Sequence, residues 1–168
     1  MKKVIYLASY KAILDRNDFD ITYQDKFVKR DISGCMLDVD LTKYDIVVAT
    51  PPCNWWSKAN YRRNNSKYAL ETKHLLPDIL KKLENIDKPF IVENVRNMKL
   101  MSDIINNFKG FYYIVGRHSY FTNIMLNMSN FKQPYDFKYG GYCLTTNKDR
   151  QGGENVTQVI NFFLDSLK

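Results

Sequence analysis

The sequence predicts an α/β fold, in which a mainly parallel sheet carries helices on both of its faces. Short apolar runs without helical periodicity, typical of buried strands, alternate with segments whose apolar residues recur at helical spacing. The clearest alternation is a strand at 45–49, an amphipathic segment at 68–85 and a second strand at 88–95. Because a helical crossover makes the strands that it joins parallel, we expect these two strands to be parallel neighbours.

Length and composition limit the classes of protein. The 168 residues fit one domain, 1–168, and 45% hydrophobic content with 12 tyrosines argues against disorder. No apolar run approaches the ~18 residues of a membrane span, so we expect no membrane contact. Three cysteines without paired spacing indicate a reduced cytoplasmic protein, and no metal-ligand spacing is present. The net charge of +7 is compatible with nucleic-acid binding.

The first forty residues contain one clear strand and several open segments. Residues 4–9 read as a strand, 10–20 as a loop or weak helix, and 21–28 as either a short strand or a connector. The segment 32–40 has a turn glycine and then apolar residues that end in Asp38 and Asp40. Acids near a strand end bind ribose in nucleotide-binding folds. A pair of solvated turn residues is an equally open interpretation.

The strand at 45–49 ends at Pro51 and Pro52, which cannot continue a sheet ladder. Cys53 follows them, at the carboxyl end of the strand, where ligands bind in open α/β sheets. A thiol held there by rigid residues and followed by Trp55 suits a nucleophile beside a flat aromatic ring. An inert buried thiol is the alternative interpretation.

A basic loop, 57–67, comes next and interleaves cations with Tyr61 and amides. This composition suits phosphate contacts, although a solvated loop is an alternative of equal weight. The residues that we assign to nucleic-acid binding are Asn54, Trp55, Trp56, Ser57, Lys58, Arg62, Arg63 and His118.

Residues 68–85 predict an amphipathic helix, and Pro77 is easiest to place in a first turn, which predicts a kink or a late start. The strand 88–95 ends in a polar pair that includes Glu93. The carboxyl ends of neighbouring parallel strands meet at one edge of a sheet, so Cys53 and Glu93 should converge.

The last third of the chain predicts a helix at 97–108 and two aromatic strands at 111–115 and 119–124. Arg117 and His118 lie in or beside the turn between these strands, where two exposed turn residues are the plainer interpretation. Residues 127–146 read as loop, and glycines at 150–156 precede a final helix.

Pro51-Pro52-Cys53, Glu93-Asn94-Val95 and the Gly153-Glu154-Asn155-Val156 stretch together resemble the DNA cytosine-5 methyltransferase family, in particular its small bacteriophage members. The resemblance runs from about Asp31 to the C-terminus and implies a trimmed Rossmann-type methyltransferase fold. It also implies that Cys53 adds to C6 of cytosine while Glu93 contacts N3 and the exocyclic amine.

The resemblance further implies S-adenosylmethionine as cofactor and DNA as substrate. Arg117 resembles the base- or phosphate-contacting arginine of the family, so the predicted catalytic residues are Cys53, Glu93 and Arg117. Asn155 is similar to a residue that closes the cofactor pocket. The predicted cofactor-binding residues are Asp38, Asp40, Thr50, Pro51 and Asn155.

Three departures from the family pattern support a second hypothesis. The family's first motif is a glycine loop, but no glycine precedes Gly34 here, and a side chain at such a turn would crowd the cofactor. Residues 119–150 leave no room for a separate target-recognition domain, which a homodimer or a partner chain would have to supply. The family's Gln-x-Arg-x-Arg motif is also absent. The alternative is a catalytically inactive phage protein that binds nucleic acid or a nucleotide, for instance an anti-defence factor in the host cytoplasm.

Overall fold

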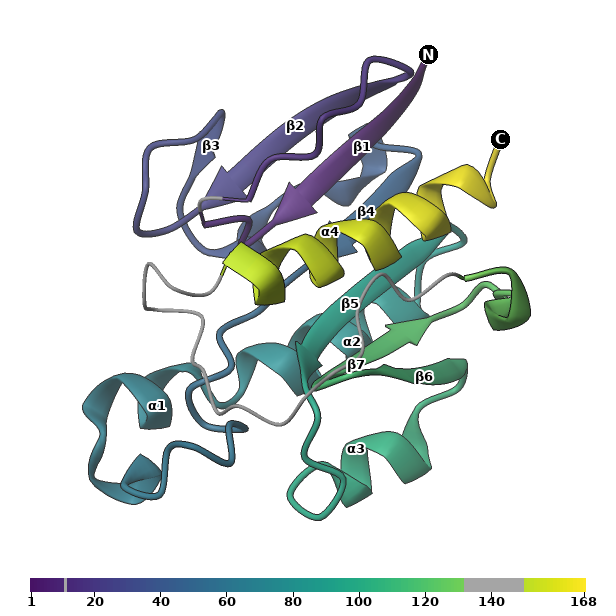
Figure 1. The fold of residues 1–168 in the computed structure, drawn as a ribbon. Helices are drawn as coiled ribbons and strands as arrows, with labels where there is room; N and C mark the ends of the chain where they lie inside the picture. The colour runs from purple at the N-terminus through teal and green to yellow at the C-terminus, as the bar shows by residue number, and fades with distance from the viewer. Residues whose placement is uncertain (11, 132–149) are drawn as a thin grey trace.

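The structure, a computed structural model, describes residues 1–10, 12–131 and 150–168, and the side chains of the last helix from residue 156 onward. Its centre is a seven-stranded sheet with the order β3-β2-β1-β4-β5-β7-β6 (Figure 1). The strands are β1 (Lys2–Leu7), β2 (Phe19–Asp25), β3 (Ile32–Ser33), β4 (Ile46–Ala49), β5 (Phe90–Val95), β6 (Phe111–Val115) and β7 (His118–Thr122).

The sheet is mainly parallel, as predicted. All neighbours from β3 to β5 are parallel, and β4 and β5 are adjacent, with Val48 paired with Ile91. Only β7 runs the other way, because a tight turn at Gly116 joins it to β6. The open question about residues 21–28 is also answered, since Phe19–Asp25 forms the strand β2 beside β1.

Helices cover both faces of the sheet (Figure 1). On one face, α2 (Leu75–Glu84) packs Leu76, Ile79 and Leu83 against inward side chains of β1, β4 and β5. On the other face, α4 (Arg150–Asp165) buries Val159, Ile160 and other apolar residues against the opposite side chains of the same strands. This alternation along each strand is the pattern of a sheet that is buried on both faces.

The segment 68–85 forms two helices rather than one. The first, α1 (Lys67–Thr72), begins at Ser66, whose hydroxyl accepts a hydrogen bond from the Ala69 N–H at 3.3 Å. The second, α2, has Pro77 in its first turn, where a missing N–H leaves no helical bond unmade. The late start expected from Pro77 is therefore confirmed.

The other boundaries differ by a few residues. The helix predicted at 97–108 is shorter, because α3 spans only Ser102–Asn107 after a turn. In the same region β7 begins at His118, so this residue belongs to a strand instead of a turn.

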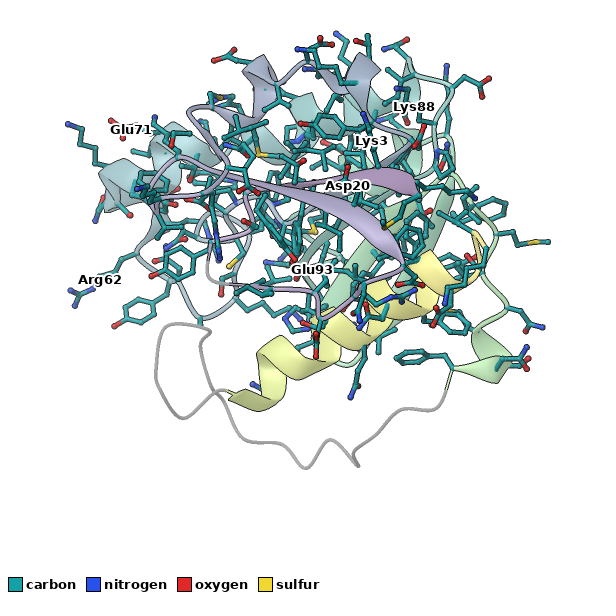
Figure 2. All side chains as sticks on the ribbon, turned by 90° about the horizontal axis from the view of Figure 1, so that it is seen from above. Lys3, Asp20, Arg62, Glu71, Lys88 and Glu93 are labelled. Atoms are coloured by element: carbon teal, nitrogen blue, oxygen red, sulfur yellow. The ribbon has the colours of Figure 1, made fainter. Side chains whose placement is uncertain are left out.

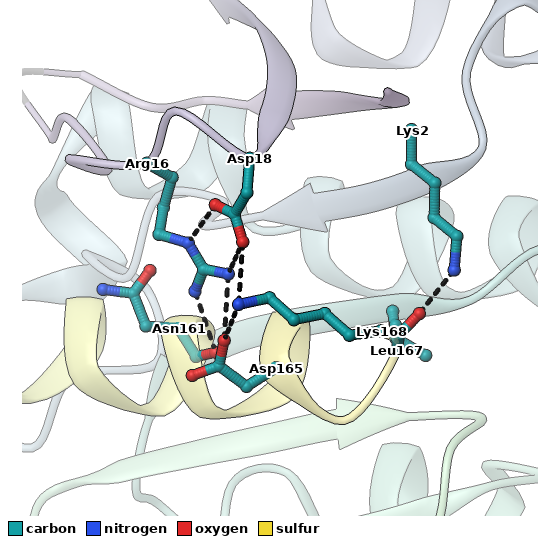
Figure 3. Close-up of polar contacts among 7 residues, drawn as sticks. All are labelled: Lys2, Arg16, Asp18, Asn161, Asp165, Leu167 and Lys168. Carbon is teal, nitrogen blue, oxygen red and sulfur yellow. Dashed lines mark hydrogen bonds and ion pairs between the residues drawn. The ribbon is translucent and has the colours of Figure 1, made fainter.

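The C-terminal end of α4 is bound to the connection between β1 and β2 (Figure 3). Arg16 contacts Asp18 at 2.7 Å and Asp165 at 2.9 Å, and Lys168 contacts the same two carboxylates at 2.8 and 3.1 Å. Arg16 is only 10% exposed, whereas Asp18, Asp165 and Lys168 are 40%, 54% and 56% exposed, so the network lies at the surface around one shielded guanidinium. It fixes the far end of α4, away from the carboxyl edge of the sheet.

No helix in the described part of the chain is long and apolar enough to cross a membrane.

Candidate active site at the carboxyl edge of the sheet

The Pro-Pro-Cys element begins directly after β4. Thr50 anchors its start, because the Thr50 hydroxyl donates to the Ala8 carbonyl at 2.9 Å. Pro51 is buried, whereas Cys53 is partly exposed. A turn follows, in which the Ser57 N–H donates to the Cys53 carbonyl at 2.8 Å. The proline rings and these bonds together fix the backbone on both sides of the Cys53 thiol.

Glu93 lies at the same edge, on the neighbouring strand. Ala49 pairs with Val92 in the register of β4 and β5, so Glu93 is the next residue beyond the last pair. Asn94, which is 1% exposed, donates from Nδ2 to the Pro51 carbonyl at 3.0 Å. This bond ties the carboxyl end of β5 to the element that carries Cys53.

Burial sets the charge of Glu93. The residue is 6% exposed, and burial raises the pKa of its carboxyl to about 8, so that it keeps its proton at neutral pH. His118 Nε2 lies 3.8 Å from Glu93 Oε1, but burial and then the charge of Arg117 lower the pKa of His118 to about 4. Both groups are therefore neutral near pH 7, and their contact is not an ion pair.

The residues predicted to bind nucleic acid divide into exposed and buried sets. Asn54, Lys58 and Arg62 are exposed, and Arg62 projects from the periphery of the molecule in Figure 2, far from Glu93. Trp55 is partly exposed, with the Lys73 ammonium 5.1 Å from its ring. Ser57 is also partly exposed.

Three of the predicted nucleic-acid residues require a correction. The Trp56 ring belongs to the core on the α2 face and is 7% exposed, because this apolar ring packs beneath the loop that carries it. Arg63 turns inward and donates from Nη2 to the Ser57 carbonyl at 2.7 Å. His118 is buried beside Glu93 instead of facing an outer surface.

The loop after β1 adopts left-handed backbone conformations without glycine: φ is 51° at Ala8 and 46° at Tyr10. Such conformations cost roughly 1–2 kcal/mol each for residues that have a Cβ. Three bonds to the end of β2 hold them. The Ala8 and Ser9 N–H groups donate to Gln24 at 2.9 and 3.0 Å, and the Tyr10 N–H donates to Asp25 at 2.7 Å. The loop after β1 therefore forms a tight turn although it contains no glycine.

A family model for the C-5 cytosine-specific DNA methylase matches residues 5–134 of this sequence. The chain belongs to this family. The match includes the second half of β1 and all of β2, which the resemblance from Asp31 onward does not cover, and it ends before α4. One similar solved structure is the Entamoeba histolytica methyltransferase EhMeth, at 18% identity and a TM-score of 0.45. The alignment covers 75% of this chain and 54% of that chain, so this chain spans about half the length of EhMeth. Comparison with curated proteins finds no match.

In this chain the acids Asp38 and Asp40 lie away from the carboxyl edge, which corrects their assignment to the cofactor site. Lys82, in the last turn of α2, donates to the carbonyls on either side of Asp38 at 2.7 and 2.9 Å. Asp40 caps the 3-10 helix that precedes β4 and lines a small surface pocket with Lys88. The last turn of α2 and the residues before β4 and β5 lie at the amino edge of the sheet, because both strands run from there toward Cys53.

The acid that does lie at the carboxyl edge is Asp25, the last residue of β2, beside β1. The sequence contains a signal for this strand, since apolar and polar residues alternate from Phe19 to Gln24. The prediction for residues 21–28, either a short strand or a connector, does not identify Asp25 as a residue at a strand end.

Aromatic side chains close to Cys53 were also missed. Burial raises the pKa of Tyr68 in α1, and electrostatic interaction with Cys53 raises it further. Asp25 and Tyr10 act on Tyr68 in the same direction, so these side chains lie near one another. Phe27 meets Tyr68 edge to face at 5.6 Å between ring centroids. No spacing in the sequence distinguishes Tyr68 from any other residue of an amphipathic helix.

The region around Asp25 fits the nucleoside part of S-adenosylmethionine. The Asp25 carboxylate offers about four lone-pair positions. The backbone N–H groups of Tyr10, Phe27 and Val28 use three of them, at 2.7, 2.7 and 3.2 Å. One position remains for a ribose hydroxyl, and the rings of Phe27 and Tyr68, which are 59% and 36% exposed, suit a flat adenine.

Arg117 and Asn155 are the two predicted site residues that remain to be located. Arg117 is exposed in the turn between β6 and β7, where its carbonyl accepts a hydrogen bond from the Arg96 N–H at 2.7 Å. Asn155 falls within α4, and its side chain lies outside the described residues. Among the described residues, no three His, Cys, Asp or Glu side chains form a group that could hold a metal ion.

Proposed function

We propose that this protein is a DNA cytosine-5 methyltransferase in which Cys53 is the nucleophile and Glu93 the proton donor. One observation carries the proposal: the partly exposed Cys53 follows β4, the buried carboxyl of Glu93 lies near the end of the adjacent parallel strand β5, and the bond from Asn94 to Pro51 ties the two segments together. A carboxyl that keeps its proton at pH 7 is able to protonate a ring nitrogen, which an ordinary carboxylate is not.

The chemistry proceeds by covalent catalysis. The Cys53 thiolate forms a bond to C6 of cytosine, and the electron pair of the C5–C6 double bond moves toward C5 as Glu93 gives its proton to N3. Carbon C5 would then take a methyl group from a sulfonium donor, and the electron pair of the broken sulfur–methyl bond would stay on the donor's sulfur. The C5 proton leaves to solvent, its electron pair expels the Cys53 thiolate, and the N3 proton returns to Glu93.

S-adenosylmethionine, when bound, supplies the methyl group. Asp25 would accept a hydrogen bond from the ribose, and Phe27 and Tyr68 would flank the adenine. Thr50 and Pro51 line the path from the end of β4 toward Cys53 and stay in the proposed cofactor site, as does Asn155.

A cytosine in duplex DNA must leave the stack to reach Cys53, since C6 is inaccessible there. Lys58 and Arg62 are placed to contact phosphates, and Arg117 contacts the base or a phosphate. We further propose that residues 1–168 form a single domain and that a second copy or a partner chain supplies target recognition. In this proposal the protein works in the cytoplasm, that of the host if a phage encodes it.

A second candidate, a catalytically inactive protein that binds nucleic acid or a nucleotide, is favoured by one observation. The N–H groups of Ala8, Ser9 and Tyr10 all donate to the end of β2. They are therefore not available to a cofactor, although the turn after the first strand often supplies such donors in nucleotide-binding folds.

Calorimetric titration with S-adenosylmethionine, followed by transfer of a labelled methyl group to single-stranded and duplex DNA, separates the two candidates. The methyltransferase proposal predicts micromolar binding and transfer that is lost in Cys53→Ala but kept in Cys35→Ala. Cys35 is the matched control because it is also a free, partly exposed cysteine. No binding at millimolar cofactor would overturn the proposal and support the inactive binder.

A further inference from the structure

Glu93 shares its face of the sheet with other polar side chains. Tyr120 is its register partner on β7, so the two side chains project from adjacent positions on the α4 side of the sheet. His118 lies next along β7, at 3.8 Å, and Thr50 follows β4 on the other side. Tyr6 on β1 also faces this group, and it is close enough to Glu93 for the two to interact electrostatically.

The Tyr120 hydroxyl differs from the other hydroxyls on this face. Tyr120 is 0% exposed, and its oxygen has no hydrogen-bond partner among the described residues. In contrast, the Tyr6 hydroxyl bonds the Thr50 side chain, and the Tyr113 hydroxyl accepts the Leu126 N–H at 2.7 Å. A buried hydroxyl without a partner is unfavourable, so its retention beside an acid requires an explanation.

The ionisation of Glu93 provides that explanation. At neutral pH both partners carry their protons, since burial raises the pKa of Glu93 to about 8 and that of Tyr120 well above its ordinary value. When Glu93 gives up its proton, negative charge develops within electrostatic range of the Tyr120 O–H group, which has no acceptor among the described residues. The Tyr120 O–H would gain an acceptor only when Glu93 is ionised. A hydrogen bond of this kind stabilises the charged state of Glu93 and not its neutral ground state.

We propose that Tyr120 is a positioning residue that donates a hydrogen bond to Glu93 when this carboxyl passes its proton to a bound pyrimidine. The proposal rests on the proposed function. Tyr120 keeps its own proton throughout: the proton that moves goes from Glu93 to N3 of the base, its electron pair stays on the carboxylate, and it returns when the thiolate leaves.

The other groups that face Glu93 are less suited to this role. The Tyr6 hydroxyl is already bonded to Thr50, whose own hydroxyl donates to Ala8. His118 is neutral near pH 7, so only one of its two ring nitrogens carries a proton to donate, whereas the Tyr120 hydroxyl always carries one. Arg117 acts on His118 and is itself exposed. Among the described residues, Tyr120 therefore provides the uncommitted donor on this face.

The test is the titration of Glu93 in the full chain, followed by its carboxyl band in infrared spectra and assigned by its loss in Glu93→Gln. Tyr120→Phe removes the hydroxyl and keeps the ring, so the pKa of Glu93 should rise by roughly one unit or more. Tyr113→Phe is the matched control and should leave the pKa of Glu93 unchanged. An unchanged or lowered pKa in Tyr120→Phe would overturn the proposal.

Two more measurements exclude a merely structural role. Tyr120→Phe should unfold at the same urea concentration as the wild type or a higher one, because it removes an unpaired buried hydroxyl. Tyr113→Phe should unfold at a lower one, because it leaves the Leu126 N–H unpaired. Methyl transfer should fall about tenfold or more in Tyr120→Phe alone. If the wild type transfers no methyl group, the proposed function fails, and the titration alone still decides whether Tyr120 acts on Glu93.

Discussion

The polar groups at the two edges of the sheet differ in how well they are hydrogen-bonded. At the amino edge, Lys88 donates to the carbonyls of Leu41 and Thr42 at 2.9 and 2.8 Å and also to Tyr44, and the Asp45 carboxylate accepts the Lys3 N–H at 2.7 Å. Figure 2 shows Lys3 and Lys88 together on one side of the molecule and Arg62 on another.

At the carboxyl edge, by contrast, Glu93 and His118 are buried and neutral, the Tyr120 hydroxyl has no partner among the described residues, and the loop after β1 holds left-handed residues. The same fold thus places paired charges at one edge and shifted pKa values with backbone strain at the other. Such unfavourable features gather at functional sites, so they support the active site that we propose at the carboxyl edge.

The largest effect should come from Glu93→Gln, which removes the transferable proton. Methyl transfer should fall by about 100-fold or more. The free energy of unfolding of Glu93→Gln should, in contrast, increase at high pH. The pKa of Glu93 is about 8 when folded and 4.5 by itself, so the wild type loses unfolding free energy as pH rises through that window. At pH 8, Glu93→Gln should therefore be more stable, by a few kcal/mol.

Urea unfolding at pH 5 and pH 8 measures this difference. Glu84→Gln is the control at the amino edge, where Glu84 accepts the Lys109 N–H at 2.8 Å, and it should change neither the pH dependence nor transfer. Equal stability of Glu93→Gln and the wild type at pH 8 would show that Glu93 is already ionised when folded.

The rate of methyl transfer should fall as pH rises above about 8, because Glu93 then loses the proton that it must donate. The expected decline is about tenfold per pH unit. A pH series of single-turnover rates measures it, and a rate that keeps rising to pH 10 would remove Glu93 from the role of acid.

At the amino edge, Lys88→Met should affect stability alone. It leaves carbonyls before β4 without their charged donor, at a loss of roughly 1–3 kcal/mol in unfolding free energy. Lys81→Met, on the exposed side of α2, is the control and should be neutral. A loss of methyl transfer without a loss of stability in Lys88→Met would contradict the assignment of stability to the amino edge and of catalysis to the carboxyl edge.

The smallest effect should come from Ala8→Gly in the loop after β1. Glycine relieves the left-handed strain at Ala8 but loses more entropy on folding, so the net gain should be about 0.5–1 kcal/mol. Thermal unfolding measures it. A destabilised variant would mean that the Ala8 side chain contributes packing that outweighs the strain.

The sequence predicted the parts of this molecule that depend on local pattern. The apolar runs of β4 and β5 and the helical spacing between them predicted their parallel order, and Pro77 predicted where α2 begins. Asp25 was within reach but was missed, because the polar residues of β2 weaken the apolar pattern on which strand prediction depends.

Other features could not have been predicted because they depend on tertiary contacts. Propensity favours glycine at the positions of Ala8 and Tyr10. Tertiary hydrogen bonds, including those that Gln24 and Asp25 accept from the two N–H groups, hold these residues in left-handed conformations. The aromatic composition of the 53–57 segment does not reveal that Trp56 turns into the core while Trp55 stays partly outside. An unpaired hydroxyl is likewise a property of the packed structure and not of a tyrosine in a strand.

Covalent trapping tests the central claim most directly. The protein is incubated with S-adenosylmethionine and an oligonucleotide that contains 5-fluorocytosine, which has no C5 proton to release and therefore stops the reaction before elimination. We predict an increase in intact mass equal to the methylated oligonucleotide, located at Cys53 after digestion and retained in Cys35→Ala. A protein that binds the cofactor but gives no adduct, or an adduct at another cysteine, would contradict the account.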